Sequence, residues 1–169
     1  MSIFTEQEAK AILDKVIKLS KADECTATLS GSDAGNIRFA LNNVSTSGIV
    51  SDANLGVQVA FGKRVGTATI NEFDDASLER VVRRAEDLAR LAPENPEFMP
   101  AIDKQTYKPS ATFSESTAAI TPEFRAKVAA DSILPCRGHG LVAAGFLEDG
   151  NGFVAIANSN GNFGYPTTT

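Results

Sequence analysis

The sequence predicts an α+β fold, in which a mostly antiparallel sheet is flanked by two helices and followed by the start of a second β-rich unit. Three observations support this fold class. Apolar residues alternate with polar or small ones over residues 55–61, Gly62 and Lys63 form a turn signature, and residues 78–89 carry an amphipathic helical stripe. Together these patterns indicate a hairpin and a helix that covers one of its faces.

The first predicted element is an amphipathic helix from Glu6 to Ser20. Thr5 and Glu8 have the spacing of a capping box, which fixes the start of the helix. Apolar residues recur at three- and four-residue steps along one face. They are Ala9, Ile12, Leu13, Val16 and Ile17.

Strands are predicted after this helix. Residues 25–30 are expected to form one strand, and a turn through residues 31–35 separates it from a second strand at residues 37–41. The alternation changes phase after Asn42 and Asn43, which indicates a bulge or bend rather than one straight strand.

A hairpin and its covering helix come next. Residues 65–70 are predicted to pair with the preceding strand, and Gly62 at the first central position of the loop is typical of a type II′ turn. The helix begins after the capping residues Asp74 and Asp75 and ends before Pro93.

We expect three parts along the chain. They are an N-terminal α+β domain at 1–95, a Pro/Ser/Thr-rich connection at 96–119, and a helix with a hairpin at 120–169. Thr121 and Pro122 open the helix of the third part, which ends before Pro135. The hairpin turns at residues 149–152. The last ten residues contain no strand or helix that would complete the third part. We therefore expect the third part to be the beginning of a second domain that is truncated at residue 169.

The net charge of −5 argues against a nucleic-acid partner, because such surfaces gather Lys and Arg. The alternating charges of residues 79–87 are typical of a solvated helix face. Two distant cysteines, Cys25 and Cys136, favour reduced thiols and a cytoplasmic location. No apolar run is long enough to predict a membrane span.

No residue is assigned a catalytic, cofactor-binding or metal-binding role. His139 is the single histidine and is expected in a loop or at a strand edge. Helix capping accounts for Asp74 and Asp75, and hairpin-loop polarity accounts for Glu148 and Asp149. Neither cysteine has a histidine partner in its sequence context, so no nucleophile is predicted.

Four segments occur in a distinctive order. They are IRFALNN (37–43), LGVQVAFGKRVGTATIN (55–71), SLERVVRRAEDLARLAPENP (77–96) and GLVAAGFLEDGNGFVAIANSNGNFGY (140–165). This order resembles the N-terminal portion of the TldD/PmbA family, also known as peptidase U62 and as candidate modulators of DNA gyrase. The segments are patterns of Gly, Asn and apolar residues rather than catalytic signatures.

The resemblance implies an N-terminal α/β domain and a larger C-terminal β-rich domain. In TldD-type subunits the latter carries zinc on an HExxxH helix, which PmbA-like (TldE) members lack. The two types pair into a metalloprotease for unfolded or extended peptides. This chain has Gln58 where many members have Arg, lacks HExxxH and is much shorter than the members.

Two functional hypotheses follow. In the first, the chain is the N-terminal scaffold of a zinc metallopeptidase subunit; it is inactive alone, and zinc is held in a C-terminal region outside it. In the second, it is a non-catalytic peptide-binding or assembly module like the PmbA/TldE partner subunit. The expected partners are a peptide at a sheet edge and a TldD/PmbA-type subunit in a homo- or hetero-oligomer, with neither nucleic acid nor membrane.

Overall fold

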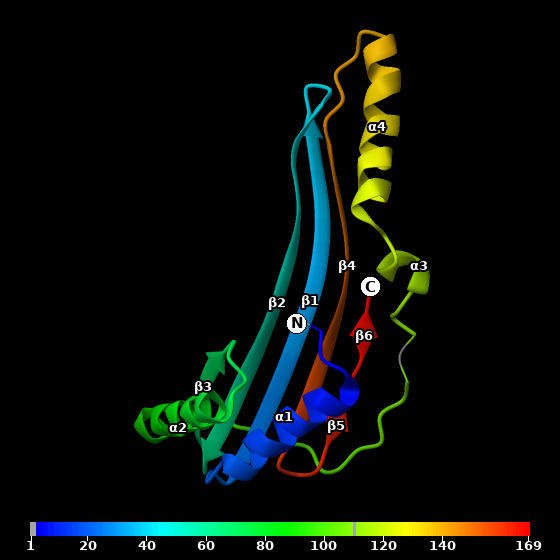
Figure 1. Ribbon diagram of the computed structural model, residues 1–169. Helices are drawn as coiled ribbons and strands as arrows, with labels where there is room; N and C mark the ends of the chain where they lie inside the picture. Colours follow the sequence, from blue (N-terminus) through cyan, green and yellow to red (C-terminus); the bar gives the residue numbers. More distant parts are fainter. Residues whose placement is uncertain (1–2, 110) are drawn as a thin grey trace.

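The computed structural model describes residues 3–109 and 111–169, which form an α+β structure around one antiparallel sheet, as the sequence predicts (Figure 1). In chain order the elements are α1 (Glu6–Leu19), β1 (Glu24–Ala40), β2 (Asn43–Phe61), β3 (Arg64–Ile70), α2 (Asp75–Leu91), α3 (Glu115–Ala118), α4 (Pro122–Gly138), β4 (Gly145–Asn158), β5 (Phe163–Gly164) and β6 (Thr167–Thr168). The strand order is β3-β2-β1-β4-β5, and β6 also pairs with β4. No helix in the described ranges has the length and hydropathy needed to cross a membrane.

Two parts of the sheet differ in what covers them. The sheet base comprises residues 24–30, 55–61, 64–70 and 153–158, and the sheet arm comprises residues 31–40, 43–54 and 145–152. Figure 1 shows α1 and α2 beside the base and α4 beside the far part of the arm. The three long strands β1, β2 and β4 run through both parts.

The helices of the base begin where the sequence predicts. The capping box of α1 is present: the Thr5 backbone N donates to Glu8 Oε2 at 2.8 Å, and the Glu8 backbone N donates to Thr5 Oγ1 at 3.3 Å. Asp74 Oδ1 accepts from the Ser77 backbone N at 3.1 Å and caps α2. Free N–H groups at both helix starts are therefore satisfied by the residues that the pattern singled out.

The main core lies between these two helices and the base. A Cβ atom on Gly66 would lie 2.2 Å from the Ala85 carbonyl oxygen and 2.3 Å from the Ala89 N, so α2 rests its backbone directly on β3. Fully buried side chains from both layers interlock here. The largest are Phe153, Leu13, Leu29, Leu55, Leu78 and Glu86.

Glu86 corrects the prediction of a solvated face over residues 79–87. Its side chain is only 1% exposed. Glu86 Oε2 accepts from Arg83 Nη1 at 2.7 Å, and Oε1 accepts from the Lys21 backbone N at 2.6 Å. Burial raises the pKa of Glu86, but the Lys21 N–H and Arg83 outweigh this effect and the net pKa is lowered. Arg83 Nη2 also donates to the Leu19 carbonyl at 2.8 Å, so these charges join α1 to α2.

The turn predicted at residues 31–35 is wrong, because β1 continues through this segment. Asp33 lies opposite Ser51 of β2 and Asn151 of β4. Neighbours on both sides keep this Gly/Ser/Asp segment extended, and such pairing is invisible in local turn propensity.

The hairpin predicted at residues 141–158 is also wrong. Residues 145–158 form the single strand β4, which pairs with β1 from Phe39–Gly145 to Thr26–Asn158. A Cβ atom on Gly152 would lie 2.9 Å from the Gly31 carbonyl oxygen. The two segments that resemble turns thus lie side by side in the arm, and their small residues allow close approach.

Two hairpin loops connect β1 to β2 and β2 to β3. The β2–β3 hairpin is confirmed, with Phe61 opposite Arg64 and Gly62 at φ 57°. The β1–β2 loop consists of Leu41 and Asn42, both at positive φ (50° and 62°). Where the sequence predicted a bulge or bend after Asn42 and Asn43, the chain reverses in this hairpin, and the pairing register shifts just beyond the loop, between residues 38 and 39.

The remaining segments depart from the prediction at their ends. Helix α4 continues through Pro135 to Gly138, and the His139 backbone N donates to the Pro135 carbonyl at 3.2 Å. The last residues form β5 and β6, where the sequence predicted no closing element. The division at 1–95, 96–119 and 120–169 stays a prediction, although β4 of the third part pairs with β1 of the first.

The connection between α2 and α3 follows the base and the chain end. The Ala101 backbone N donates to Glu24 Oε2 at 2.8 Å, and the Gln105 backbone N donates to Asn162 Oδ1 at 2.6 Å. Thr112 Oγ1 donates to the Thr167 carbonyl at 2.7 Å. These bonds place the connection alongside the sheet.

Candidate functional site

The arm contains an open strand edge. Among the described residues, β3 pairs with β2 only over residues 55–61, so the outer edge of residues 43–54 has no partner strand. Figure 1 shows β2 continuing far beyond β3 along β1. All residues from Asn43 to Asp52 are exposed. Unpaired backbone N–H and C=O groups on such an edge can pair with another chain.

Residues alternate in direction along this edge. In the hairpin, the backbone N–H and C=O groups of Phe61 point toward β3. Every second residue of a strand directs these groups to the same side, so those of Ser47, Ile49 and Ser51 point toward the open edge. Three apolar side chains are among the exposed ones: Val44, Ile49 and Val50. The edge therefore offers hydrogen-bonding groups together with apolar surface.

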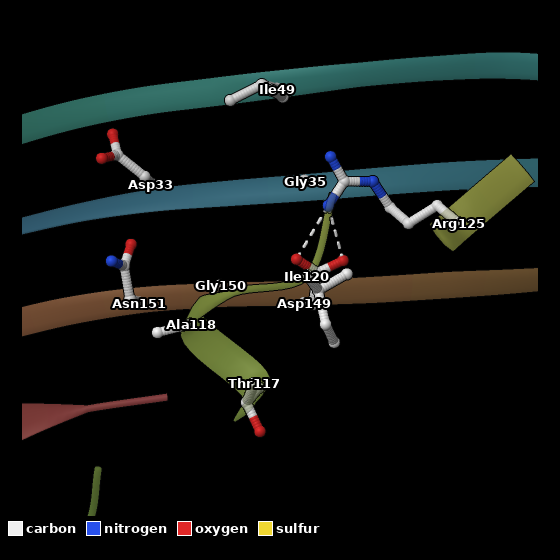
Figure 2. A pocket seen from close by; sticks show the side chains of 10 residues that line it. All are labelled: Asp33, Gly35, Ile49, Thr117, Ala118, Ile120, Arg125, Asp149, Gly150 and Asn151. Atoms are coloured by element: carbon white, nitrogen blue, oxygen red, sulfur yellow. Dashed lines mark hydrogen bonds and ion pairs between the residues drawn. The ribbon is translucent and has the colours of Figure 1, made fainter. Parts of the chain in front are cut away.

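A buried ion pair lies on the α4 side of the arm. Arg125 Nη1 donates to Asp149 Oδ1 at 2.8 Å and to Oδ2 at 2.7 Å, and the two side chains are 4% and 9% exposed. Figure 2 shows the guanidinium over β1 at Gly35, between Asp149 and the strand of Ile49. A Cβ atom on Gly35 would lie 2.2 Å from Arg125 Nη1, so glycine makes room for the guanidinium.

Two adjoining cavities surround this ion pair. One has a volume of about 210 Å³, and its lining includes Asp33, Gly35, Ile49, Ile120, Arg125 and Asp149. The other has a volume of about 620 Å³ and shares Asp33, Ile120 and Asp149 with the first. The open edge and the ion pair are thus parts of one region, since Ile49 belongs to both.

The two acidic pairs of the sequence, Asp74/Asp75 and Glu148/Asp149, lie in different surroundings in the structure. Asp74 caps α2, its pKa is lowered by its hydrogen bonds with Ser77, and Asp75 forms an ion pair with Lys15. Capping of α2 is therefore confirmed. Asp149 lies in β4 rather than in a hairpin loop, so loop polarity does not explain it.

Histidine and cysteine side chains are not brought together. His139 is exposed at the C-terminal cap of α4, Cys25 is buried in β1, and Cys136 is half-buried in α4. Burial raises the pKa of the Cys25 thiol to about 11, which disfavours the nucleophilic thiolate. Within residues 3–109 and 111–169, no group of three His, Cys, Asp or Glu side chains could hold a metal ion. These residues therefore do not fit a zinc site.

Sequence reasoning missed Arg125. The buried residues of α4 are Arg125, Ala129 and Ile133. These three residues follow one another at four-residue steps, but the first of them is charged, so the sequence showed no apolar helical pattern on this face. The partner Asp149 is 24 residues away in the chain, at a site that resembled a loop.

One family model matches the chain. Residues 29–89 match the model described as PmbA/TldA metallopeptidase domain 1. This segment contains most of β1, all of β2 and β3, and α2 up to Ala89. No curated protein matches the chain.

Solved structures share the fold. TldE from Thermococcus kodakarensis has a TM-score of 0.82 at 16% identity, with coverage of 94% of this chain and 36% of that one. A candidate modulator of DNA gyrase from Bacteroides thetaiotaomicron has a TM-score of 0.73 at 16% identity, with coverage of 98% and 39%. One from Thermotoga maritima has 0.69 at 13% identity, with coverage of 94% and 37%.

These likenesses extend over nearly the whole chain, which spans less than two fifths of the length of each solved structure. At such low identity they show the fold, while the family model identifies the segment from β1 to α2. Together they confirm the resemblance to the N-terminal portion of the TldD/PmbA family, whose first-domain model matches residues 29–89 of this chain.

Proposed function

We propose that the open edge of β2 binds an extended peptide by strand addition, as the scaffold wall of the peptide cleft in a TldD/PmbA-like metallopeptidase subunit. The observation that carries this proposal is the run from Asn43 to Asp52, whose residues are all exposed and whose outer edge has no partner strand among the described residues. An added strand would gain main-chain hydrogen bonds along the edge and would cover exposed apolar side chains.

The proposal gives the chain a binding role and no catalytic role. The family description names a metallopeptidase, but the described residues do not fit a zinc site. We therefore expect zinc and its general base to be supplied by an HExxxH helix outside residues 1–169. Proteolysis of the bound peptide belongs to that complete subunit, in a cytoplasmic setting in which the two free cysteines stay reduced.

A second candidate function is assembly with another TldD/PmbA-type subunit. The TM-score to TldE, at 0.82, exceeds those to the two candidate gyrase modulators, at 0.73 and 0.69, which favours a PmbA/TldE-like partner subunit. In this alternative the strand that pairs with the β2 edge belongs to a protein partner.

A proline at the edge tests the peptide proposal. Ser51→Pro removes one outward N–H group and leaves the pairing of β2 with β1 in place, because edge strands tolerate proline. With the full chain and a fluorescein-labelled, doubly blocked octapeptide rich in Thr and Ala, we expect roughly tenfold weaker binding, the loss of about 1.4 kcal/mol. Fluorescence anisotropy measures the affinity.

Ser51→Ala is the matched control, since it keeps the backbone N–H, and should bind like the wild type. Equal affinity of the Pro and Ala variants would refute strand addition at this edge. Sedimentation of the free chain and of its complex with the labelled peptide distinguishes peptide binding from assembly. Edge-to-edge assembly of two chains would double the mass, and Ser51→Pro would weaken that assembly as well.

A further inference from the structure

The open edge of β2 carries different charges at its two ends. Toward the base, Asp52 is exposed and forms no ion pair with any described residue. No Asp or Glu occurs from Ala34 to Ser51. At the tip of the arm, Arg137 Nη2 donates to the Asn42 carbonyl at 2.6 Å, which places a cation beside the start of β2. The edge is therefore negative toward the base and positive toward the tip.

An added strand has a preferred direction on this edge. All strand pairs among the described residues are antiparallel, including β2 with β3 on the same side of β2. Figure 1 shows that β3 ends near the base, so an antiparallel addition would continue along β2 in the direction of β3. Antiparallel pairing is also slightly more stable per residue than parallel pairing. The N-terminal part of an added peptide would then lie beside Asp52.

Three positions of β2 face the side chains of such a peptide most closely. Since Ser47, Ile49 and Ser51 turn their backbone groups outward, residues opposite positions 48, 50 and 52 form non-hydrogen-bonded pairs. Directly opposed Cα atoms are only about 4.5 Å apart in such pairs, so their side chains interact most strongly. Helix α4 packs on the other face, because its cluster includes Ile37, which lies opposite Ser47.

Two of these positions favour a particular kind of side chain. A carboxylate at position 52 favours a basic residue directly opposite. A Cβ atom on Gly48 would have no atom within 4 Å, so the space over this glycine is open. An aromatic ring opposite Gly48 can lie across the glycine and contact the neighbouring Val50, which is 62% exposed. In an added strand these two residues are four positions apart.

We propose that the β2 edge selects extended peptides in which a basic residue is followed four positions later by an aromatic residue. The peptide binds antiparallel to β2, with the basic residue opposite Asp52 and the aromatic residue opposite Gly48. This proposal rests on strand addition at the β2 edge, as proposed above, and adds the class of peptide that the edge prefers.

Two peptides of equal composition test the selection. The first is Lys-Thr-Val-Thr-Phe-Thr-Thr, blocked at its N-terminus and labelled with fluorescein at its C-terminus, and the second exchanges Lys and Phe. Their charges are equal, so general attraction to a chain of net charge −5 is the same for both. With the full chain at low salt, fluorescence anisotropy should show about fivefold tighter binding of the first peptide.

The possible failures are distinct. Equal affinities of the two peptides, both weakened by Ser51→Pro, would overturn the selection and leave strand addition intact. No binding of either peptide or of the Thr/Ala octapeptide would refute strand addition, and the selection with it.

Two variants of exposed residues separate the charge from the ring. Asp52→Lys should reverse the charge preference, so that the first peptide binds better when its Lys is replaced by Glu. Gly48→Val fills the open space and should remove the advantage of Phe over Ala in the first peptide. Gly48 is not at positive φ, so the second variant should keep the fold, which urea unfolding checks. An unchanged preference in either variant would contradict the proposed contact at that position.

Discussion

The sheet base and the sheet arm are built from the same three long strands but are stabilised in different ways. In the base, α1 and α2 cover one face, and Leu29, Leu55 and Val57 are fully buried. In the arm, α4 covers a small cluster around Ile37 and Phe39, and an ion pair takes the place of further apolar contacts. One strand can therefore serve a core at one end and remain accessible at the other.

Strand β2 shows this difference most clearly. Its residues from Leu55 onward alternate between buried and less buried, whereas every residue from Asn43 to Asp52 is exposed. Burial of apolar area stabilises the base, and the arm depends on pairing with β1 and on α4. We therefore expect the base to supply most of the stability of the fold and the arm to supply the binding surface.

Two truncations in the same strand give the largest expected contrast. Leu29→Ala in the base should lower the free energy of unfolding by about 3 kcal/mol, because it leaves a cavity under two helices. Ile37→Ala in the arm should cost the global transition less and should mainly speed amide hydrogen exchange near α4. Urea unfolding and hydrogen exchange measure the two effects. Equal losses in the global transition would show that base and arm unfold as one unit.

Removal of the buried charge in the base should have an intermediate effect that depends on pH. Glu86→Gln should lower the free energy of unfolding by about 2 kcal/mol at neutral pH, because Arg83 loses its buried partner. The pKa of Glu86 is lowered in the folded protein. Its ionised form therefore stabilises above the ordinary pKa of 4.5, and this stability is lost as the pH falls through the folded pKa.

The difference between wild type and Glu86→Gln should accordingly narrow in urea unfolding below about pH 4. Glu79→Gln is the control, since Glu79 lies 3.8 Å from Arg83 at an exposed position and its pair should contribute little. A difference that stays constant with pH would show that the charge of Glu86 is not what joins the helices.

The smallest expected effect lies at the tip of the arm. Leu41 adopts φ 50° and is 75% exposed, so its side chain gains little burial for a disfavoured backbone conformation. Leu41→Asn should stabilise the tip by up to about 1 kcal/mol, because Asn tolerates this region better. Hydrogen exchange of the β1–β2 loop measures the change. Leu41→Ala keeps the same strain and should give no gain; a gain with Ala would exclude backbone strain as the cause.

The sequence predicts the base better than the arm for a physical reason. The capping box at Thr5, the turn at Gly62 and the cap at Asp74 are local signals, and each appears in the structure where expected. The arm depends on pairing between residues more than 100 positions apart, as at Asp33 and Asn151. Local turn propensity at both positions therefore predicted loops that pairing overrides.

The candidate site follows the same division. A peptide-binding sheet edge was a prediction from the sequence, but its location on β2 required the extent of β3, which the structure supplies. The ion pair was out of reach, because Arg125 occupies a position of α4 that reads as polar and Asp149 a position that reads as loop. Charged residues in a buried stripe become recognisable only when their partner is known.

The place of β4 beside β1 sets an order for folding during synthesis. The β1–β2 hairpin can form as soon as Phe61 has left the ribosome, but the other edge of β1 must wait for Asn158. Until then the edge of β1 that later pairs with β4 stays open, on a segment rich in small residues. Completion of the sheet is therefore a late event, and a chaperone that shields strand edges would act on this protein chiefly before β4 emerges.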